Sequence, residues 1–246
     1  MTVLLGIDCS TDPQKTGLAL GELRDPIVHI SHWDTGRKGE KPEDIAKRIV
    51  TDKNWLLNCD SVLIALDAPL GWPQALGVCL KDHRAGNSIP EKADKLFRRL
   101  TDDKIKERLG KRPLEVGANL IARTAVAALV LLDEIRRSAG RSIPLAWNPV
   151  EPEPWRAIEV YPAATRIAHG APDHGGKLDH RLDQFLTYPE EIKKESEHEI
   201  DAAVCALAAG DFLRGQAVPP HDDHEIERAK IEGWIWAPPK FEEQPT

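Results

Sequence analysis

The 246-residue sequence lacks any run of eighteen apolar residues, which is the length that a membrane-spanning helix requires. Its opening, MTVLLGIDCS, has no basic region, and its apolar run is too short for the core of a signal peptide. These two absences predict a cytoplasmic protein that does not enter a membrane.

Closely spaced cysteine pairs are also missing. The four cysteines, Cys9, Cys59, Cys79 and Cys205, are scattered along the chain and include no CxxC motif. Structural zinc sites normally take their ligands in such short-spaced pairs. Because Cys9 and Cys205 lie in apolar segments, packed and reduced thiols are the simpler interpretation.

An overall excess of positive charge is absent as well. The formal net charge is −7, which argues against non-specific wrapping of nucleic acid by a basic face. Residues 92–112 differ from the rest, because they hold nine Lys or Arg against four Asp or Glu. This segment is either a solvated helical face or a patch that meets phosphate.

What the sequence does contain is an alternation of strand-like and helix-like segments. Three apolar segments separated by turns predict antiparallel strands, and later strands alternate with helices, which together indicate a mixed α/β sheet flanked by helices. The predicted strands are 2–8, 16–23, 26–33, 61–66 and 155–162, and the predicted helices are 41–58, 116–140 and 198–215.

Four carboxylates interrupt this apolar pattern. Asp8 and Asp67 directly follow apolar strands, Glu159 lies within one, and Asp201 opens the apolar helix face AAVCALAA. An ionised carboxylate near a core is costly unless it is paired or binds a metal. The ends of strands in an open α/β sheet are where ligand crevices form, and Mg²⁺ or Mn²⁺ prefers oxygen ligands.

Each carboxylate also has a purely structural interpretation. Asp8 suits a turn, and Asp67 suits a cap for the Pro- and Gly-rich turn that follows it. Asp201 suits the first turn of a helix, where the dipole favours an acid. Glu159 is harder to explain in this way, because Glu is a poor strand residue.

Six segments carry a resemblance to a known family. They are GIDCS, ALDAPLGWP, FRRLTDD, IEVYPAAT, HEIDAAVCALAAG and EGWIWAPP, which together span residues 6–239. In this order they resemble the successive blocks of the DUF429 family, which is described as predicted nucleases with a ribonuclease H-like fold. The resemblance implies one domain over residues 1–240, with a helical insertion around 74–150 and a flexible tail at 241–246.

For the fold, the resemblance implies a ribonuclease H-like mixed sheet of three antiparallel strands followed by parallel strands. For the site, it implies that Asp8, Asp67 and Asp201 hold one or two divalent metals, Mg²⁺ or Mn²⁺. Glu159 would be a further ligand or would support the ligands from behind. His198 lies on the same helical face as Asp201 and is either a ligand, a proton shuttle or a solvated surface histidine.

The segment RRLTDD adds a candidate of another kind. Arg99 is the favoured phosphate-binding residue, since a guanidinium suits phosphate geometry. We expect Thr101 to cap the helix that DKIKERL would form.

The function expected from these residues is that of a divalent-metal-dependent nuclease, with nucleic acid as its candidate partner. Two metals would supply the activated water, the in-line geometry and the stabilisation of the leaving oxygen, while the carboxylates hold them. Three alternatives stay open: an actin-like phosphotransferase, a non-catalytic module that binds a ligand or partner, and a hydrolase of small phosphoesters. The choice of DNA or RNA, the number of metals and the oligomeric state also stay open.

Overall fold

The computed structural model describes residues 2–56, 58–117, 119–174, 177–189 and 196–240. The segment 241–246, predicted to be a flexible tail, lies outside these residues. The strands are β1 (Thr2–Asp8), β2 (Gly17–Arg24), β3 (Ile27–Thr35), β4 (Ser61–Asp67), β5 (Trp155–Glu159) and β6 (Leu186–Thr187). The helices are α1 (Pro42–Lys47), α2 (Gln74–Leu80), α3 (Ala93–Phe97), α4 (Leu100–Leu109), α5 (Asn119–Ala139), α6 (Pro162–Ala168), α7 (Glu197–Leu213) and α8 (Asp223–Glu232).

The strands form one mixed sheet in the order β5-β4-β1-β2-β3-β6. Strands β1, β2 and β3 pair antiparallel, and β4 and β5 then continue the sheet parallel to β1. This arrangement confirms the predicted mixed sheet of three antiparallel strands followed by parallel strands. It places the carboxyl ends of β1, β4 and β5 along one rim of the sheet.

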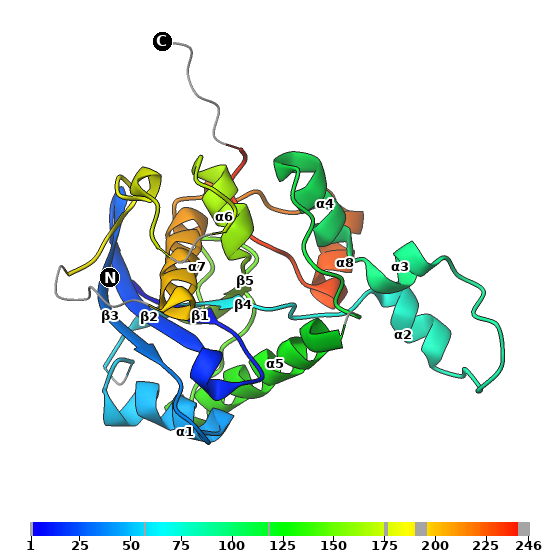
Figure 1. Ribbon diagram of the computed structural model, residues 1–246, viewed down its shortest axis with the longest axis horizontal. Helices are drawn as coiled ribbons and strands as arrows, with labels where there is room; N and C mark the ends of the chain where they lie inside the picture. Colours follow the sequence, from blue (N-terminus) through cyan, green and yellow to red (C-terminus); the bar gives the residue numbers. More distant parts are fainter. Residues whose placement is uncertain (1, 57, 118, 175–176, 190–195, 241–246) are drawn as a thin grey trace, which may run out of the picture.

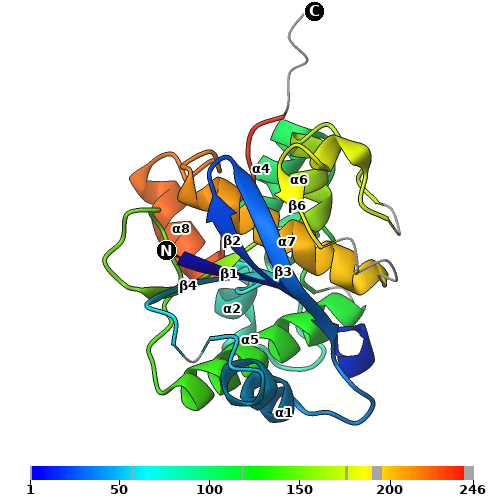
Figure 2. The same ribbon diagram turned by 90° about the vertical axis from the view of Figure 1, so that its left-hand side faces the viewer.

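Helices cover both faces of the sheet, with α7 on one face and α5 with α1 on the other (Figures 1 and 2). Side chains that alternate along each strand therefore enter two separate cores. Leu4 and Leu63 pack in the core that contains α7, whereas Leu5 and Ile64 pack in the core that contains α5. This double burial explains why the middle of β4 reads as an unbroken apolar run.

Two glycines let α7 lie unusually close to the sheet. A Cβ atom on Gly6 would stand 1.9 Å from the carbonyl oxygen of Ala202, and one on Gly17 would stand 1.9 Å from that of His198. Only glycine leaves room for such backbone-to-backbone contact. The first turns of α7 are therefore held against the carboxyl end of β1.

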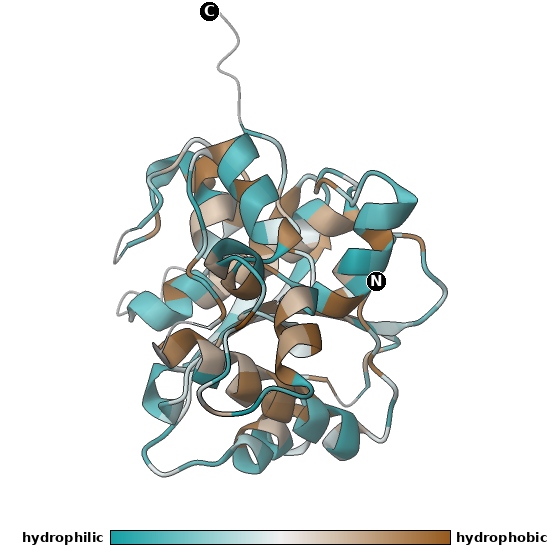
Figure 3. Cartoon of the chain, turned by 90° about the vertical axis from the view of Figure 1, so that its right-hand side faces the viewer, coloured by the Kyte–Doolittle hydropathy of each residue, from teal (hydrophilic) through white to brown (hydrophobic). Residues whose placement is uncertain are grey.

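The segment between β4 and β5, predicted as an insertion over 74–150, does not form one separate unit. Helix α5 is part of the main core through Ala128 and Leu132, whereas α2 and α3 project from the body (Figure 1). In the hydropathy view, the hydrophobic segments gather toward the middle and the hydrophilic ones toward the edges (Figure 3). None of the helices in the described ranges is long and apolar enough to cross a membrane.

Several boundaries differ from the sequence prediction. The helix predicted over 41–58 is only α1, followed by one π-helical turn at Arg48–Asp52. Strand β5 ends at Glu159, and α6 begins three residues later. Helix α8 and the short edge strand β6 were not predicted, since neither has a strong apolar period of its own.

Candidate active site

The site is built on two neighbouring strand ends. Asp8 and Asp67 are the last residues of β1 and β4, and their α-carbons are direct partners in the parallel register. Asp8 is two residues beyond Gly6, which faces α7, and Asp67 is two residues beyond Ala65, which packs in the α7 core. By the alternation of the strands, both carboxylates therefore leave the sheet on the α7 side.

Helix α7 brings two further predicted residues to this rim. Ser196 caps the helix and pairs reciprocally with Glu199, which fixes where the helix begins. His198 and Asp201, three residues apart, then share a helical face. The Nδ1 atom of His198 lies 2.7 Å from a carboxylate oxygen of Asp8.

Charge repulsion and burial act together on these acids. Burial first, and then the charges of Asp201 and Glu197, raise the pKa of Asp8 to about 8. Burial, followed by the charges of Asp8 and Asp201, raises the pKa of Asp67 well above its usual range. The three aspartates therefore sense one another electrostatically, and without a cation the site retains protons at neutral pH.

The carboxylate of Asp201 is paired with a basic side chain. The guanidinium of Arg166, a buried residue of α6, donates a hydrogen bond of 2.8 Å to its carboxylate. Burial still raises the pKa of Asp201, although Arg166 lowers it. Sequence reasoning missed Arg166, because nothing in its local segment shows that α6 packs beside α7.

The donor set suits a hard divalent cation in its chemistry. The aspartates offer only oxygen ligands, and Asp67 accepts no hydrogen bond from the described residues. Within the described ranges, however, no three His, Cys, Asp or Glu side chains are already grouped to hold one ion. Asp8 contacts His198 and Asp201 contacts Arg166, so these two contacts compete with an ion for the same oxygens.

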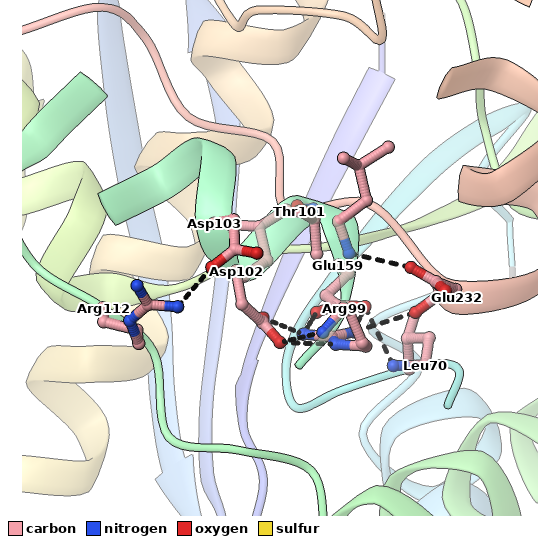
Figure 4. Close-up of polar contacts among 10 residues, drawn as sticks. Leu70, Arg99, Thr101, Asp102, Asp103, Arg112, Glu159 and Glu232 are labelled. Carbon is pink, nitrogen blue, oxygen red and sulfur yellow. Dashed lines mark hydrogen bonds and ion pairs between the residues drawn. The ribbon is translucent and has the colours of Figure 1, made fainter. Parts of the chain in front are cut away.

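Glu159 lies on the other face of the sheet, although its charge helps to raise the pKa of Asp67. Its register partner is Leu66, which packs in the α5 core, so Glu159 leaves the sheet on the face opposite Asp67. Its carboxylate accepts hydrogen bonds from Arg99 and from the backbone N–H of Leu70, both at 2.9 Å (Figure 4). Of the two roles expected for Glu159, these contacts favour support of the ligands from behind, because its oxygens already hold a buried guanidinium and the turn after Asp67.

Arg99 is likewise not placed to bind phosphate. Its side chain is 1% exposed, and its Nε and Nη atoms bond to the carboxylates of Asp102 and Glu159 and to the carbonyl oxygen of Glu232. These contacts occupy all five N–H donors of a guanidinium. Burial opposes the charged form, yet the two carboxylates raise the pKa of Arg99, which therefore stays charged.

This buried network ties the rim together. Glu232, at the end of α8, accepts from the backbone N–H groups of Leu100 and Gln74, so it joins α4 to the start of α2. Thr101 does not cap α4 as predicted; its hydroxyl accepts from the N–H of Ile235 instead. Arg99 and Glu159 thus support the loop that carries Asp67 rather than meeting a substrate.

A cavity of about 260 Å³ opens beside Asp67 on the α5 side of the rim. Its lining includes Tyr161, which follows β5, and Thr124 of α5. Sequence reasoning did not single out either residue, since a lone Tyr or Thr carries no specific signal. The lining residues are Cys9, Asp67, Ala68, Pro69, Arg99, Pro113, Leu114, Ile121, Thr124, Glu159, Val160, Tyr161 and Ile235.

Comparison with known proteins gives a matching family and a similar solved structure. A family model described as "Protein of unknown function (DUF429)" matches residues 6–225. No curated protein matches the chain. The chain is similar to T. thermophilus RuvC in complex with Holliday junction substrate, with 12% identity, coverage of 89% of this chain and 99% of that one, and a TM-score of 0.43. A likeness this weak transfers neither substrate nor chemistry.

Proposed function

We propose that this chain, which belongs to the DUF429 family, is a divalent-metal-dependent phosphodiester hydrolase that acts on nucleic acid. The observation that carries the proposal is the pairing of Asp8 with Asp67 at adjacent strand ends, with Asp201 close enough to raise the pKa of both. Three mutually repelling carboxylates at one rim do not stabilise the fold. They are useful in a site that binds a cation, because the cation offsets their repulsion.

Asp8, Asp67 and Asp201 would hold Mg²⁺ or Mn²⁺. When bound, the cation supplies stabilisation of the charge that develops on the phosphoryl oxygens and lowers the pKa of water. Asp67 offers a carboxylate with no competing partner among the described residues, so it is the natural first ligand. Asp201 must exchange the contact with Arg166 to take part.

His198 is placed to move a proton. When Asp8 is ionised, the Nδ1 atom of His198 donates the hydrogen bond to it, which leaves Nε2 as a proton acceptor. The side chain is 32% exposed, so a water molecule can reach it. This is the arrangement that a general base requires, with a carboxylate to orient the ring.

Glu159 and Arg99 would position the site without touching the reacting atoms. The bond from the N–H of Leu70 to Glu159 fixes the turn that begins immediately after Asp67. Arg99 neutralises Glu159 and anchors it to α4. We assign both as positioning residues.

The test compares Asp67→Asn with Asp60→Asn. Both residues flank β4, but Asp60 is exposed at the opposite end of the strand, so it matches the substitution without touching the rim. We expect Asp67→Asn to lower Mn²⁺-dependent cleavage of labelled DNA and RNA strands by about 100-fold or more, since losing even an outer contact of a metal site costs 10–100-fold. Asp60→Asn should cleave like the parent.

Two further measurements make the test decisive. Calorimetric titration with Mn²⁺ should show binding to the parent and to Asp60→Asn, and much weaker binding to Asp67→Asn. Absence of Mn²⁺ binding to the parent, together with no cleavage of any strand, would refute the hydrolase and favour a non-catalytic binding module. Equal cleavage by Asp67→Asn and the parent would refute the site.

A further inference from the structure

The cavity beside Asp67 is bounded largely by apolar side chains. Its sides are mostly apolar or aromatic and include Pro69, Pro113, Leu114, Ile121 and Tyr161. Leu114 is 67% exposed although it lines the cavity, so a large apolar side chain stands uncovered at this position. Planar, uncharged groups gain most from such walls.

Two hydroxyl groups that line the cavity are unsatisfied within the described part of the chain. The hydroxyl of Thr124 and the phenol of Tyr161 have no hydrogen-bond partner among the described residues. Other helical threonines, Thr51 and Thr165, donate to the carbonyl four residues earlier, so Thr124 differs from them. Two such hydroxyl groups in an apolar cavity are suited to hydrogen-bonding with the polar edge of a ligand.

The size of the cavity limits what can enter. Pockets for drug-sized ligands measure about 300–1,000 Å³, and this one is smaller, at about 260 Å³. Among the described lining residues the only cation is Arg99, whose donors are all in use. The cavity therefore suits a single ring system and offers nothing that would attract a phosphate.

We propose that this cavity receives one unpaired nucleobase of the substrate strand, next to the phosphodiester held at Asp67. The inference rests on the proposed function, because Asp67 lines the cavity and also belongs to the acidic rim. The ring would lie against Tyr161 and the prolines, with Thr124 facing its polar edge. Contacts to a base would supply the affinity that a chain of net charge −7 cannot take from a basic groove.

Binding without metal tests this inference separately from catalysis. The probe is a single strand carrying one 2-aminopurine, in DNA and RNA form, titrated by fluorescence in the presence of EDTA. The second probe is the same strand with an abasic site at that position. We expect the parent to bind the 2-aminopurine strand about tenfold more tightly than the abasic one, as loss of one stacked base predicts.

Two tryptophan variants of α5 locate the base. Thr124→Trp fills the cavity and should abolish the preference for the strand with the base. Val126→Trp places the same side chain on the exposed face of the same helix, 53% exposed in the parent, and should keep the preference. Tyr161→Ala should lower the affinity for the base about tenfold, while Tyr161→Phe, which retains the ring, should lower it less. Circular dichroism checks that each variant is folded.

The outcomes separate the two proposals. Loss of the base preference in Thr124→Trp and Tyr161→Ala, with retention in Val126→Trp, supports the cavity as a base site even if no strand is cleaved. Equal binding of abasic and base-containing strands by the parent overturns it, even if Mn²⁺-dependent cleavage is found. Displacement of the probe by inorganic phosphate alone would also overturn it, because the cavity would then be selecting the phosphate.

Discussion

Asp8 and Asp67 are register partners across the parallel strands β1 and β4, so that two acids occupy neighbouring strand ends. His198 hydrogen-bonds to Asp8, with its Nδ1 atom 2.7 Å from a carboxylate oxygen. Burial, and then the charges of neighbouring acids, raises the pKa of both residues, so the rim retains protons. This makes the rim sensitive to pH.

The first prediction follows from the sign of that shift. The pKa of Asp8 is 3.8 in an unperturbed chain and about 8 in the folded protein, so the folded state binds the extra proton between these values. Stability should therefore fall as pH rises from about 4 to 8, by up to about 1.4 kcal/mol per pH unit for one group. Asp8→Asn should remove the share that belongs to Asp8 and leave that of Asp67, whose pKa burial also raises.

Urea unfolding at pH 5, 6.5 and 8, without metal, measures the slope. The difference between parent and Asp8→Asn should grow steadily with pH, with the variant the more stable at pH 8. Adding Mn²⁺ at pH 8 should stabilise the parent and leave Asp8→Asn little changed. A parent whose stability rises with pH relative to the variant would contradict the shift.

The second prediction concerns the close contact between α7 and the sheet. Gly17→Ala places a Cβ atom 1.9 Å from the carbonyl oxygen of His198, so the backbone of α7 must move. We expect a loss of about 1–3 kcal/mol in the free energy of unfolding, as for other overpacked sites, and a weaker contact between His198 and Asp8.

Gly77→Ala is the matched control. Gly77 lies in α2, and a Cβ atom there meets nothing within 4 Å, so alanine should be neutral or stabilising by up to about 1 kcal/mol. Urea midpoints of the two variants should therefore move in opposite directions, or only Gly17→Ala should move. Equal stability of Gly17→Ala and the parent would contradict the packing described.

The third prediction concerns the buried pair of Glu159 and Arg99. Glu159→Gln removes the charge that faces Arg99, leaving a buried guanidinium with Asp102 as its remaining anion. Breaking one partner of a buried ion pair costs about 3–5 kcal/mol. Glu227→Gln removes an exposed pair with Lys230 and should cost less than about 1 kcal/mol.

Chemical denaturation of both variants tests this contrast. Since Glu159 also holds the N–H of Leu70, Glu159→Gln should disturb the turn after Asp67 and weaken Mn²⁺ binding as well. Were Glu159→Gln as stable as Glu227→Gln, the network could not be what holds the rim together.

The sequence predicted five of the six described strands, and the acids at the ends of β1 and β4, because both depend on local pattern. An apolar run that stops at a carboxylate identifies a strand end, and this holds for Asp8 and Asp67 whatever lies far away. Glu159 also follows apolar strand residues, but its side chain leaves the sheet on the other face. Which face it takes depends on the register between β4 and β5. Register is set by long-range pairing, which a single segment does not reveal.

For Arg99, too, the sequence alone could not predict the partners of a charged side chain. In the sequence it is one of nine basic residues in 92–112, with nothing to mark it as buried. Its partners Glu159 and Glu232 are 60 and 133 residues away, so only the tertiary fold shows that its donors are taken. Arg166 was overlooked for the same reason, because its partner Asp201 lies 35 residues further along.

The backbone contacts at Gly6 and Gly17 make the two sides of the rim differ in how far they can move. At these two glycines no side chain separates the backbone of α7 from the sheet, so this wall has little room to slide or rotate toward what approaches it. The opposite wall is made of loops and the start of α5, where side chains have room to adjust. On the proposed function, the rigid α7 side would fix the position of the phosphodiester. The opposite side would adjust to ligands of different shape.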